Sequence, residues 1–149
     1  MPRIEKAVLV RAPVAKVYAI ARDVDSFPEF MEDLQSLTVL ERSEDGNRTV
    51  TEWVGLIREF KMTVRWTQED VWDADRHRDD FRMLKGDLDS MSGWWRFAAE
   101  DGATRFESVL DYEFHVPLVG PMIQALIRKK MDANLEAQMQ AIRRKAEGA

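Results

Sequence analysis

The sequence has no cysteine. Disulfide bonds, cysteine nucleophiles and thiolate metal sites are therefore excluded, which is compatible with a reducing compartment. Histidine is almost as scarce, because only His77, in a charged turn-like segment, and His115, on the polar face of a predicted strand, are present. Neither has a partner at the spacing of metal ligands, so we expect no metal site and no cofactor.

Long apolar runs are also missing. No stretch approaches the roughly 18 apolar residues of a membrane-spanning helix, and the charged N-terminal sequence MPRIEK lacks the apolar core of a signal peptide. We therefore expect a cytoplasmic protein without stable membrane insertion. The formal net charge of -5 argues against a nucleic-acid partner, because neutralising phosphates requires a basic surface.

Local catalytic motifs are absent as well. The glycines form neither a P-loop nor a dinucleotide-binding fingerprint, and there is no G-x-S-x-G nucleophile motif. Acidic residues are plentiful, and Glu52 and Asp111 fall inside predicted strands between apolar neighbours. Turned inward, either carboxyl group would have a raised pKa and would be a candidate general acid or base. Turned outward, it would form an ion pair with a residue such as Arg65.

The composition is typical of one globular domain covering residues 1–149. The chain is 45% hydrophobic and 33% charged, so it has enough apolar side chains to offset the entropy of folding. Apolar and polar residues alternate with a period of two along much of the chain, which predicts strands. We expect about seven strands, at residues 3–10, 34–42, 48–57, 59–72, 78–84, 91–99 and 104–115, with turns that include 44–47, 85–87 and 101–102.

Three other segments have helical spacing. One helix is predicted to begin at Ala12-Pro13, and a short one covers residues 25–31. The longest runs from Pro121 to about Arg144, and its apolar stripe needs the concave face of a sheet as a partner. The predicted fold is therefore α+β, in the order β-α-α-β-β-β-β-β-β-α, with a curved antiparallel sheet wrapped around a long C-terminal helix.

Three groups of residues, in this order, resemble those of a known superfamily. They are residues 4–18, ending in APVAKVY; residues 23–31, DVDSFPEFM; and the series WRF, GATR, DYEF and PLVG at 95–97, 102–105, 111–114 and 117–120. The chain resembles the helix-grip (START/SRPBCC) superfamily of START lipid-transfer domains, pathogenesis-related plant proteins and polyketide aromatase/cyclases. It is most similar to the bacterial polyketide cyclase/dehydrase and coenzyme Q-binding branch. The resemblance implies a ligand cavity between sheet and long helix, and no particular ligand.

Alternation also predicts which side chains face the long helix. The aromatic and Met-rich set on each strand points inward, and it forms either a packed core or the wall of a cavity. Met side chains adapt to both, and Gly93 opposite large aromatic residues would widen a cavity. The predicted cavity residues are Trp53, Met62, Val64, Trp66, Phe81, Met91, Trp95, Phe97, Phe106, Ser108, Leu110, Tyr112, Met122, Leu126, Met131, Asn134, Leu135 and Gln138.

Polar groups within this set would orient a ligand. Ser108 and Tyr112 carry hydroxyl groups and are the candidates for catalysis, whereas Asn134 and Gln138 lie one turn apart on the helix. Gln68 continues the inner face of its strand. Each of these residues alternatively bonds only to neighbouring protein groups or water.

The mouth of the cavity is expected at the short helix and at the loop 117–121. Phe27, Phe30 and Met31 would act there as gate residues, or alternatively as a hydrophobic plug over the core.

Three functions fit these observations. The preferred one is a carrier or binding protein for a small hydrophobic molecule, such as a lipid, an isoprenoid quinone or an aromatic polyketide. The second is a polyketide cyclase/dehydrase that uses Tyr112 or Ser108 with ordered water in the same cavity. The third is an interaction protein whose groove takes a partner's hydrophobic segment, for which an exposed Trp94 and the basic run at 128–130 would argue. We expect a monomer or a weak dimer.

Overall fold

The computed structural model describes residues 3–57, 61–114 and 120–148. Within these residues, seven strands form one sheet in which every neighbouring pair is antiparallel. Strands consecutive in the sequence are neighbours, except that β1 joins the sheet beside the last strand, β7. From edge to edge the order is β1 (Arg3–Val10), β7 (Ala103–Glu113), β6 (Ser90–Glu100), β5 (Arg78–Gly86), β4 (Met62–Asp73), β3 (Arg48–Ile57) and β2 (Leu34–Arg42).

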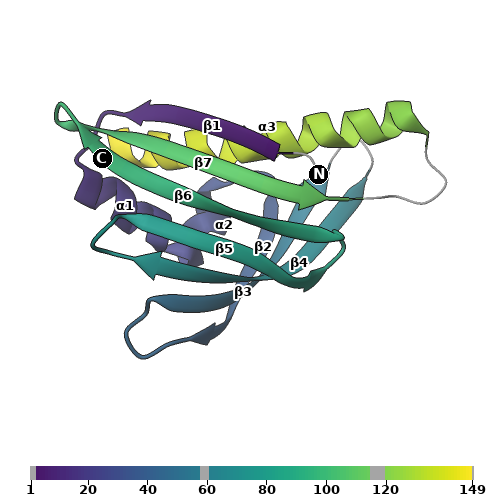
Figure 1. Ribbon diagram of the computed structural model, residues 1–149, viewed down its shortest axis with the longest axis horizontal. Coiled ribbons are helices and arrows are strands. Elements are labelled where there is room, and N and C mark those ends of the chain that lie inside the picture. The colour runs from purple at the N-terminus through teal and green to yellow at the C-terminus, as the bar shows by residue number, and fades with distance from the viewer. Residues whose placement is uncertain (1–2, 58–60, 115–119, 149) are drawn as a thin grey trace.

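The helices gather on the concave side of the sheet. Figure 1 shows α3 running alongside β1 and β7, with α1 close to its C-terminal end. The expected α+β helix-grip arrangement, with a long C-terminal helix held against a curved antiparallel sheet, is confirmed. The helical elements are α1 (Val14–Arg22), the single-turn 3₁₀ helix η1 (Val24–Ser26), α2 (Phe27–Phe30) and α3 (Pro121–Glu147).

Irregular strand pairing bends the sheet. The β2–β3 pairing shifts register twice, and the β4–β5 pairing shifts between Thr67 and Gln68. Such bulges increase the local twist and bend the strand that carries them. Gly86, at the end of β5, has a φ of +155°, and a Cβ at this position would lie 2.5 Å from the Cβ of its partner Trp66. Glycine therefore allows β5 to approach β4 this closely.

The predicted alternation of faces is confirmed. The outer face carries ion pairs between neighbouring strands, Arg3 to Asp111 at 2.8 Å and Arg65 to Glu52 at 3.1 Å. Hydrogen bonds from Arg3 lower the pKa of Asp111. Glu52 and Asp111 therefore point outward, and the ion-pair alternative holds for both. On β6 and β7 the inward, buried set is Met91, Trp95, Phe97, Phe106, Ser108, Leu110 and Tyr112.

Some element limits differ from the predicted ones. The strand predicted at 59–72 is observed as Met62–Asp73, and Phe60 lies outside the described residues. The turn predicted at 85–87 was wrong for its first two positions, because β5 continues to Gly86. The register shift between β4 and β5 keeps this end of β5 paired, and the sequence pattern alone does not reveal it.

The C-terminal helix is longer than the sequence predicts. α3 continues past the predicted end at Arg144 as far as Glu147. His115 and most of the predicted mouth loop at 117–121 lie outside the described residues. Among the helices of the described ranges, none combines the length and apolar character needed to cross a bilayer.

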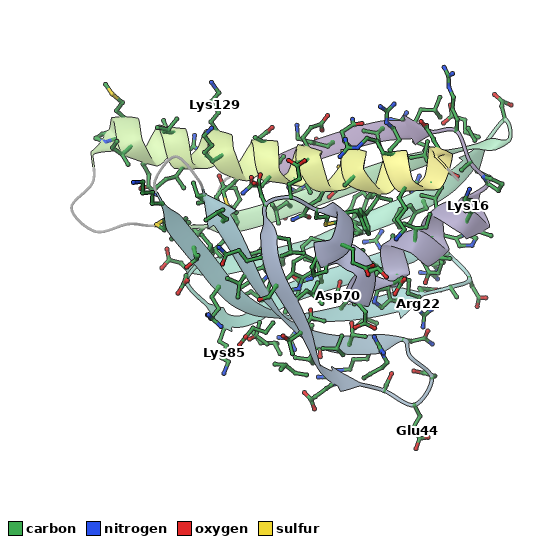
Figure 2. All side chains as sticks on the ribbon, turned by 180° about the vertical axis from the view of Figure 1, so that it is seen from behind. Lys16, Arg22, Glu44, Asp70, Lys85 and Lys129 are labelled. Carbon is green, nitrogen blue, oxygen red and sulfur yellow. The ribbon has the colours of Figure 1, made fainter. Side chains whose placement is uncertain are left out.

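The first turns of α3 extend beyond the sheet (Figure 1). Met122 is 83% exposed, and Leu126 is 37% exposed. In Figure 2, Lys129 points away from the sheet, whereas Asp70 lies inside the fold. The apolar stripe of the helix is therefore buried only from Ile127 onward.

The solid part of the core lies near α1. Phe97 and Phe106 have ring centroids 4.5 Å apart, and Tyr18 of α1 makes edge contacts with Trp72 and Phe97. Met139 of α3 is fully buried in the same cluster. Side chains fill this end of the fold, so any space for a ligand lies farther along the concave face.

Candidate functional site

A cavity of about 440 Å³ lies between the concave face of the sheet, α2 and α3. Its volume is in the range of small-molecule sites in proteins. Side chains from β3, β4, β5, β6 and β7 form one wall, and α3 forms the facing wall. The lining is mostly apolar, so the cavity suits a molecule with a large apolar surface.

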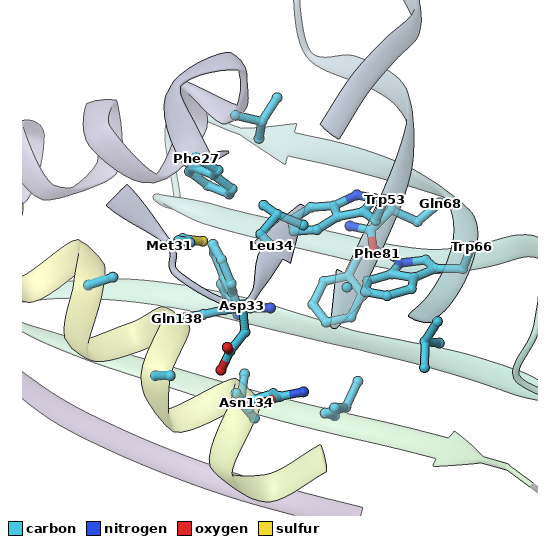
Figure 3. Close-up of a pocket in the computed structure, with 18 of the residues that line it drawn as sticks. Phe27, Met31, Asp33, Leu34, Trp53, Trp66, Gln68, Phe81, Asn134 and Gln138 are labelled. Carbon is cyan, nitrogen blue, oxygen red and sulfur yellow. Dashed lines mark hydrogen bonds between the residues drawn. The ribbon is translucent and has the colours of Figure 1, made fainter. Parts of the chain in front are cut away.

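Aromatic rings dominate the sheet wall. Trp53 and Trp66 are direct partners on β3 and β4, and their rings stack 5.6 Å apart with planes tilted by 11°. Figure 3 shows this pair beside Phe81, with Phe27 projecting from α2 into the same group of side chains. Phe27 approaches Trp53 and Trp95 with ring centroids 5.9 and 6.4 Å away. This continuous surface of flat rings favours a flat, aromatic ligand.

The helix wall is built from side chains spaced three or four residues apart. Met131, Asn134, Leu135 and Gln138 of α3 line the cavity, and this spacing places them on one face of the helix. Asn134 and Gln138 project from α3 toward the cavity in Figure 3. The helix therefore contributes two amide groups to an otherwise apolar wall.

A hydrogen-bonded row of polar side chains runs along β4. The indole N–H of Trp66 donates to Gln68 Oε1 at 2.8 Å, and Gln68 Nε2 donates to Asp70 Oδ1 at 2.7 Å. Asp70 in turn shares a hydrogen bond with Asp79 of β5. Alternation places the three β4 residues on the same face of the strand, so the row follows the cavity wall.

The two carboxyl groups at the end of this row are buried. Asp70 is 4% exposed and Asp79 is 2% exposed, and both line the cavity. Burial raises the pKa of each, and the nearby charge of Asp70 raises the pKa of Asp79 further. The hydrogen bonds from Asp79 and Gln68 oppose the rise at Asp70. The pKa of Asp79 is therefore raised more strongly than that of Asp70, which favours Asp79 as the proton donor of the pair and Asp70 as the acceptor.

The cavity opens between α3 and the segment that follows α2. The exposed lining residues are Glu32 on one side and Ala137 and Arg144 on the other. Phe30 is half-buried at this opening, and the Lys145 ammonium lies 4.5 Å from its ring centroid. This cation–π contact links α2 to the end of α3 across the opening.

Residues 10–139 match the family described as polyketide cyclase / dehydrase and lipid transport. The chain belongs to this family. A search of curated proteins gave no match.

Solved structures of other proteins share the fold over almost the whole chain. TTHA0849 from Thermus thermophilus is 30% identical, with a TM-score of 0.90 and 97% of each chain covered. The Zhui aromatase/cyclase from Streptomyces sp. R1128 is 20% identical, with a TM-score of 0.88 and coverage of 98% of this chain and 93% of that one. A START superfamily protein from Mycobacterium smegmatis is 19% identical, with a TM-score of 0.79 and coverage of 98% and 97%. The last two show a common fold.

Many of the sequence-predicted residues line the cavity. The three predicted mouth residues do not occupy equivalent positions. Phe27 and Met31 are buried in the cavity wall, as a hydrophobic plug would be, whereas Phe30 lies at the opening. Gln68 also lines the cavity, as its strand position indicates. The predicted cavity residues found in the lining are Trp53, Val64, Trp66, Phe81, Met91, Trp95, Leu110, Met131, Asn134, Leu135 and Gln138.

Other predicted cavity residues lie elsewhere. Phe97 and Phe106 belong to the solid core near α1, and Met62 is only half-buried near the start of β4. Met122 and Leu126 were expected in the lining, and this expectation was wrong because α3 begins beyond the sheet. Helical spacing identifies the apolar face of α3, and it does not indicate how far the sheet extends beneath it.

The two candidates for catalysis also lie outside the lining. Ser108 is 1% exposed and Tyr112 is 3% exposed, both on the inner face of β7. Burial raises the pKa of Tyr112, and the charge of Arg128 opposes this rise. These two hydroxyl groups were predicted to face a ligand in the cavity. In the structure, neither Ser108 nor Tyr112 lines the cavity.

Sequence reasoning missed the buried carboxyl pair. The charged segment around His77 is typical of a solvated turn, so Asp79, at the start of the predicted strand 78–84, was not assigned to the inner face. Asp79 is two residues before the inward-facing Phe81 and shares its face of β5. Asp70 likewise continues the face of Trp66 and Gln68. Extending the alternation by one more pair of residues on each strand would have found both carboxyl groups.

Two further expectations need correction. Gly93 was expected to widen the cavity, but the Phe81 ring fills the space above it, only 2.9 Å from where a Cβ would lie. Trp94 was expected to be exposed, but it is half-buried, and the Arg78 guanidinium lies 4.8 Å from its ring centroid.

Within the described ranges, no three His, Asp or Glu side chains could hold a metal ion together.

Proposed function

We propose that this protein binds a small, flat, apolar molecule in the cavity between the sheet and α3, as a binding or carrier protein. The observation that carries the proposal is the apolar cavity of about 440 Å³ whose wall contains the stacked Trp53 and Trp66. Transfer of an aromatic ligand from water to such a wall is favourable by roughly 25 cal/mol per Å² of apolar surface removed from water. Membership of a family that includes lipid transport supports the same proposal.

The proposal is tested by ligand binding to the purified protein. Native mass spectrometry would be combined with titration of N-phenylnaphthylamine, a neutral aromatic probe whose emission rises in apolar surroundings. We expect saturable binding of one probe molecule per chain. Absence of both a co-purifying apolar molecule and probe binding would contradict the proposal.

A second candidate function is acid–base catalysis in the same cavity, and the Asp70–Asp79 pair favours it. Loss of water from a β-hydroxy ketone needs a proton for the leaving hydroxyl group and a base for the α-carbon proton. Asp79, with the more strongly raised pKa, would supply the proton and Asp70 would act as the base, and both residues line the cavity. Cyclase/dehydrase activity is also part of the family description.

This candidate is tested with the aldol of benzaldehyde and acetone, whose dehydration forms a conjugated enone that absorbs in the near ultraviolet. We expect turnover by the wild-type protein and its loss in Asp79→Asn and Asp70→Asn. Equal rates with and without protein would rule out this chemistry for that substrate class and leave the binding function unaffected.

A further inference from the structure

One cross-strand row on the concave face brings four polar side chains together. Strand register pairs Trp72 with Asp79, Asp79 with Trp95, and Trp95 with Ser108. The row therefore crosses β4, β5, β6 and β7 at a single level of the sheet. Trp72, Asp79 and Trp95 line the cavity, and each of the four residues is at most 5% exposed.

Every member of this row has a buried polar atom without a hydrogen-bond partner among the described residues. These atoms are Trp72 Nε1, Asp79 Oδ1, Trp95 Nε1 and Ser108 Oγ. Buried polar groups in folded proteins nearly always have a partner, so a row of such atoms is unusual. The other two cavity tryptophans differ, because the Trp53 indole donates to Thr51 and the Trp66 indole to Gln68.

The three residues of the row that line the cavity carry unpartnered atoms with complementary hydrogen-bonding roles. The two indole N–H groups are donors only, so each needs an acceptor from the ligand. Asp79 lies between the two tryptophans in the row and has an unpartnered Oδ1, while the same carboxyl group bonds to Asp70. Among the described residues, no cation contributes to the pKa of Asp70 or Asp79, so the negative charge of the pair is not neutralised by an ion pair.

We propose that Trp72, Asp79 and Trp95 form a recognition site for a hydroxyl group, so that the ligand of the cavity is an aromatic molecule with a neutral hydroxyl at one end. This inference rests on the proposed binding function and names the class of ligand for it. A hydroxyl oxygen accepts a hydrogen bond from an indole N–H, and its proton is donated to Asp79 Oδ1.

Other polar end groups satisfy the site less well. A carboxylate would bring a further negative charge beside the acidic pair, and like charges in a buried site repel each other strongly. An ether oxygen accepts from an indole but donates nothing to Asp79. An ammonium group donates to Asp79 and leaves both indole N–H groups without an acceptor. The hydroxyl group alone among these acts as donor and acceptor at once while remaining neutral.

The test compares four probes that share one ring system: naphthalene, β-naphthol, β-naphthyl methyl ether and β-naphthoic acid. Dissociation constants would be measured by equilibrium dialysis at neutral pH. We expect β-naphthol to bind about tenfold more tightly than naphthalene or the methyl ether, because it alone makes both kinds of hydrogen bond. β-Naphthoic acid should bind at least about a hundredfold more weakly than β-naphthol.

Variants then assign the selectivity to the row. Trp95→Phe keeps the ring and removes the N–H, and Asp79→Leu removes the carboxyl group. In each, the preference for β-naphthol over naphthalene should fall to about twofold. Trp94→Phe is the matched control, because Trp94 is the next residue on β6 and lies on the outer face under Arg78. The control should keep the full preference.

The outcomes separate this inference from the function on which it rests. Failure of all four probes to bind the wild-type protein would overturn both. Equal binding of naphthalene and β-naphthol, unchanged by Trp95→Phe, would overturn the hydroxyl site and leave the apolar cavity as a binding site. Since Trp95→Phe is a conservative change, it also gives a result if Asp79→Leu fails to fold.

Discussion

Trp53 and Trp66 face each other across β3 and β4 with their rings almost parallel, 5.6 Å apart. Each indole N–H is bonded within its own strand, to Thr51 and to Gln68. The rings are thus held in place before any ligand arrives, and ordering them upon binding requires little additional entropy.

We expect Trp66→Leu to weaken binding of N-phenylnaphthylamine by about tenfold, because the ligand loses a flat contact surface. Fluorescence titration would measure the effect. Trp94→Leu, on the outer face of the sheet, serves as the control and should bind the probe as the wild type does. Equal affinity of the two variants would show that the stacked pair contributes nothing to the site.

Phe27 is 1% exposed and contacts Phe30, Trp53 and Trp95. Phe27→Ala should lower the free energy of unfolding by about 3–5 kcal/mol, as for other large-to-small changes in cores. Urea denaturation would measure this loss. Phe30→Ala is the comparison, because Phe30 is half-buried at the opening, and its loss should be clearly smaller. A similar loss in both variants would mean that Phe27 is not the better-packed residue.

Gln68 joins Trp66 to Asp70 through both ends of its amide group. Gln68→Leu leaves the indole N–H and a carboxylate oxygen without these partners, and we expect destabilisation of about 1–3 kcal/mol for each group left unsatisfied. Gln140→Leu is the control, since its only described side-chain bond is to Glu136 at 3.3 Å on α3. Equal stability of the two variants in urea would contradict a structural role for the row along β4.

The buried Asp79 should make stability depend on pH. Burial, and then the charge of Asp70, raises its pKa in the folded protein above the ordinary value of 3.8. The folded state thus binds a proton that the unfolded state releases, so the contribution of Asp79 is present at low pH. That contribution is lost as pH rises from about 3.8 through the raised pKa, by at most about 1.4 kcal/mol per pH unit for one proton.

Asp79→Asn removes this titration, so its stability relative to the wild type should increase with pH across that window. Urea unfolding from acidic to mildly basic pH would give the difference at each pH. Asp75→Asn is the control, because Asp75 is exposed in the turn before β5 and is not among the groups that shift the pKa of Asp79. A constant difference between Asp79→Asn and the wild type would show that Asp79 does not titrate in this range.

The sequence predicted the sheet and much of its wall, and its failures have identifiable causes. Period-two alternation is a local property, so it correctly turned Trp53, Trp66 and Trp95 inward. Asp79 was missed because the charged residues before it are typical of a turn, while its burial depends on pairing with Trp72 across the sheet. The exposure of Met122 depends on where the sheet ends relative to α3, which is a property of the whole fold.

The two walls of the cavity differ in mechanical stiffness. Ladder hydrogen bonds tie each strand of the sheet wall to its neighbours, whereas side-chain packing against β1 and α1 holds α3 in place. Sliding a packed helix breaks no backbone hydrogen bond, but spreading two strands breaks several. A ligand larger than the cavity would therefore be accommodated by displacement of α3, and the spacing of the tryptophans on the sheet would stay constant from one ligand to another.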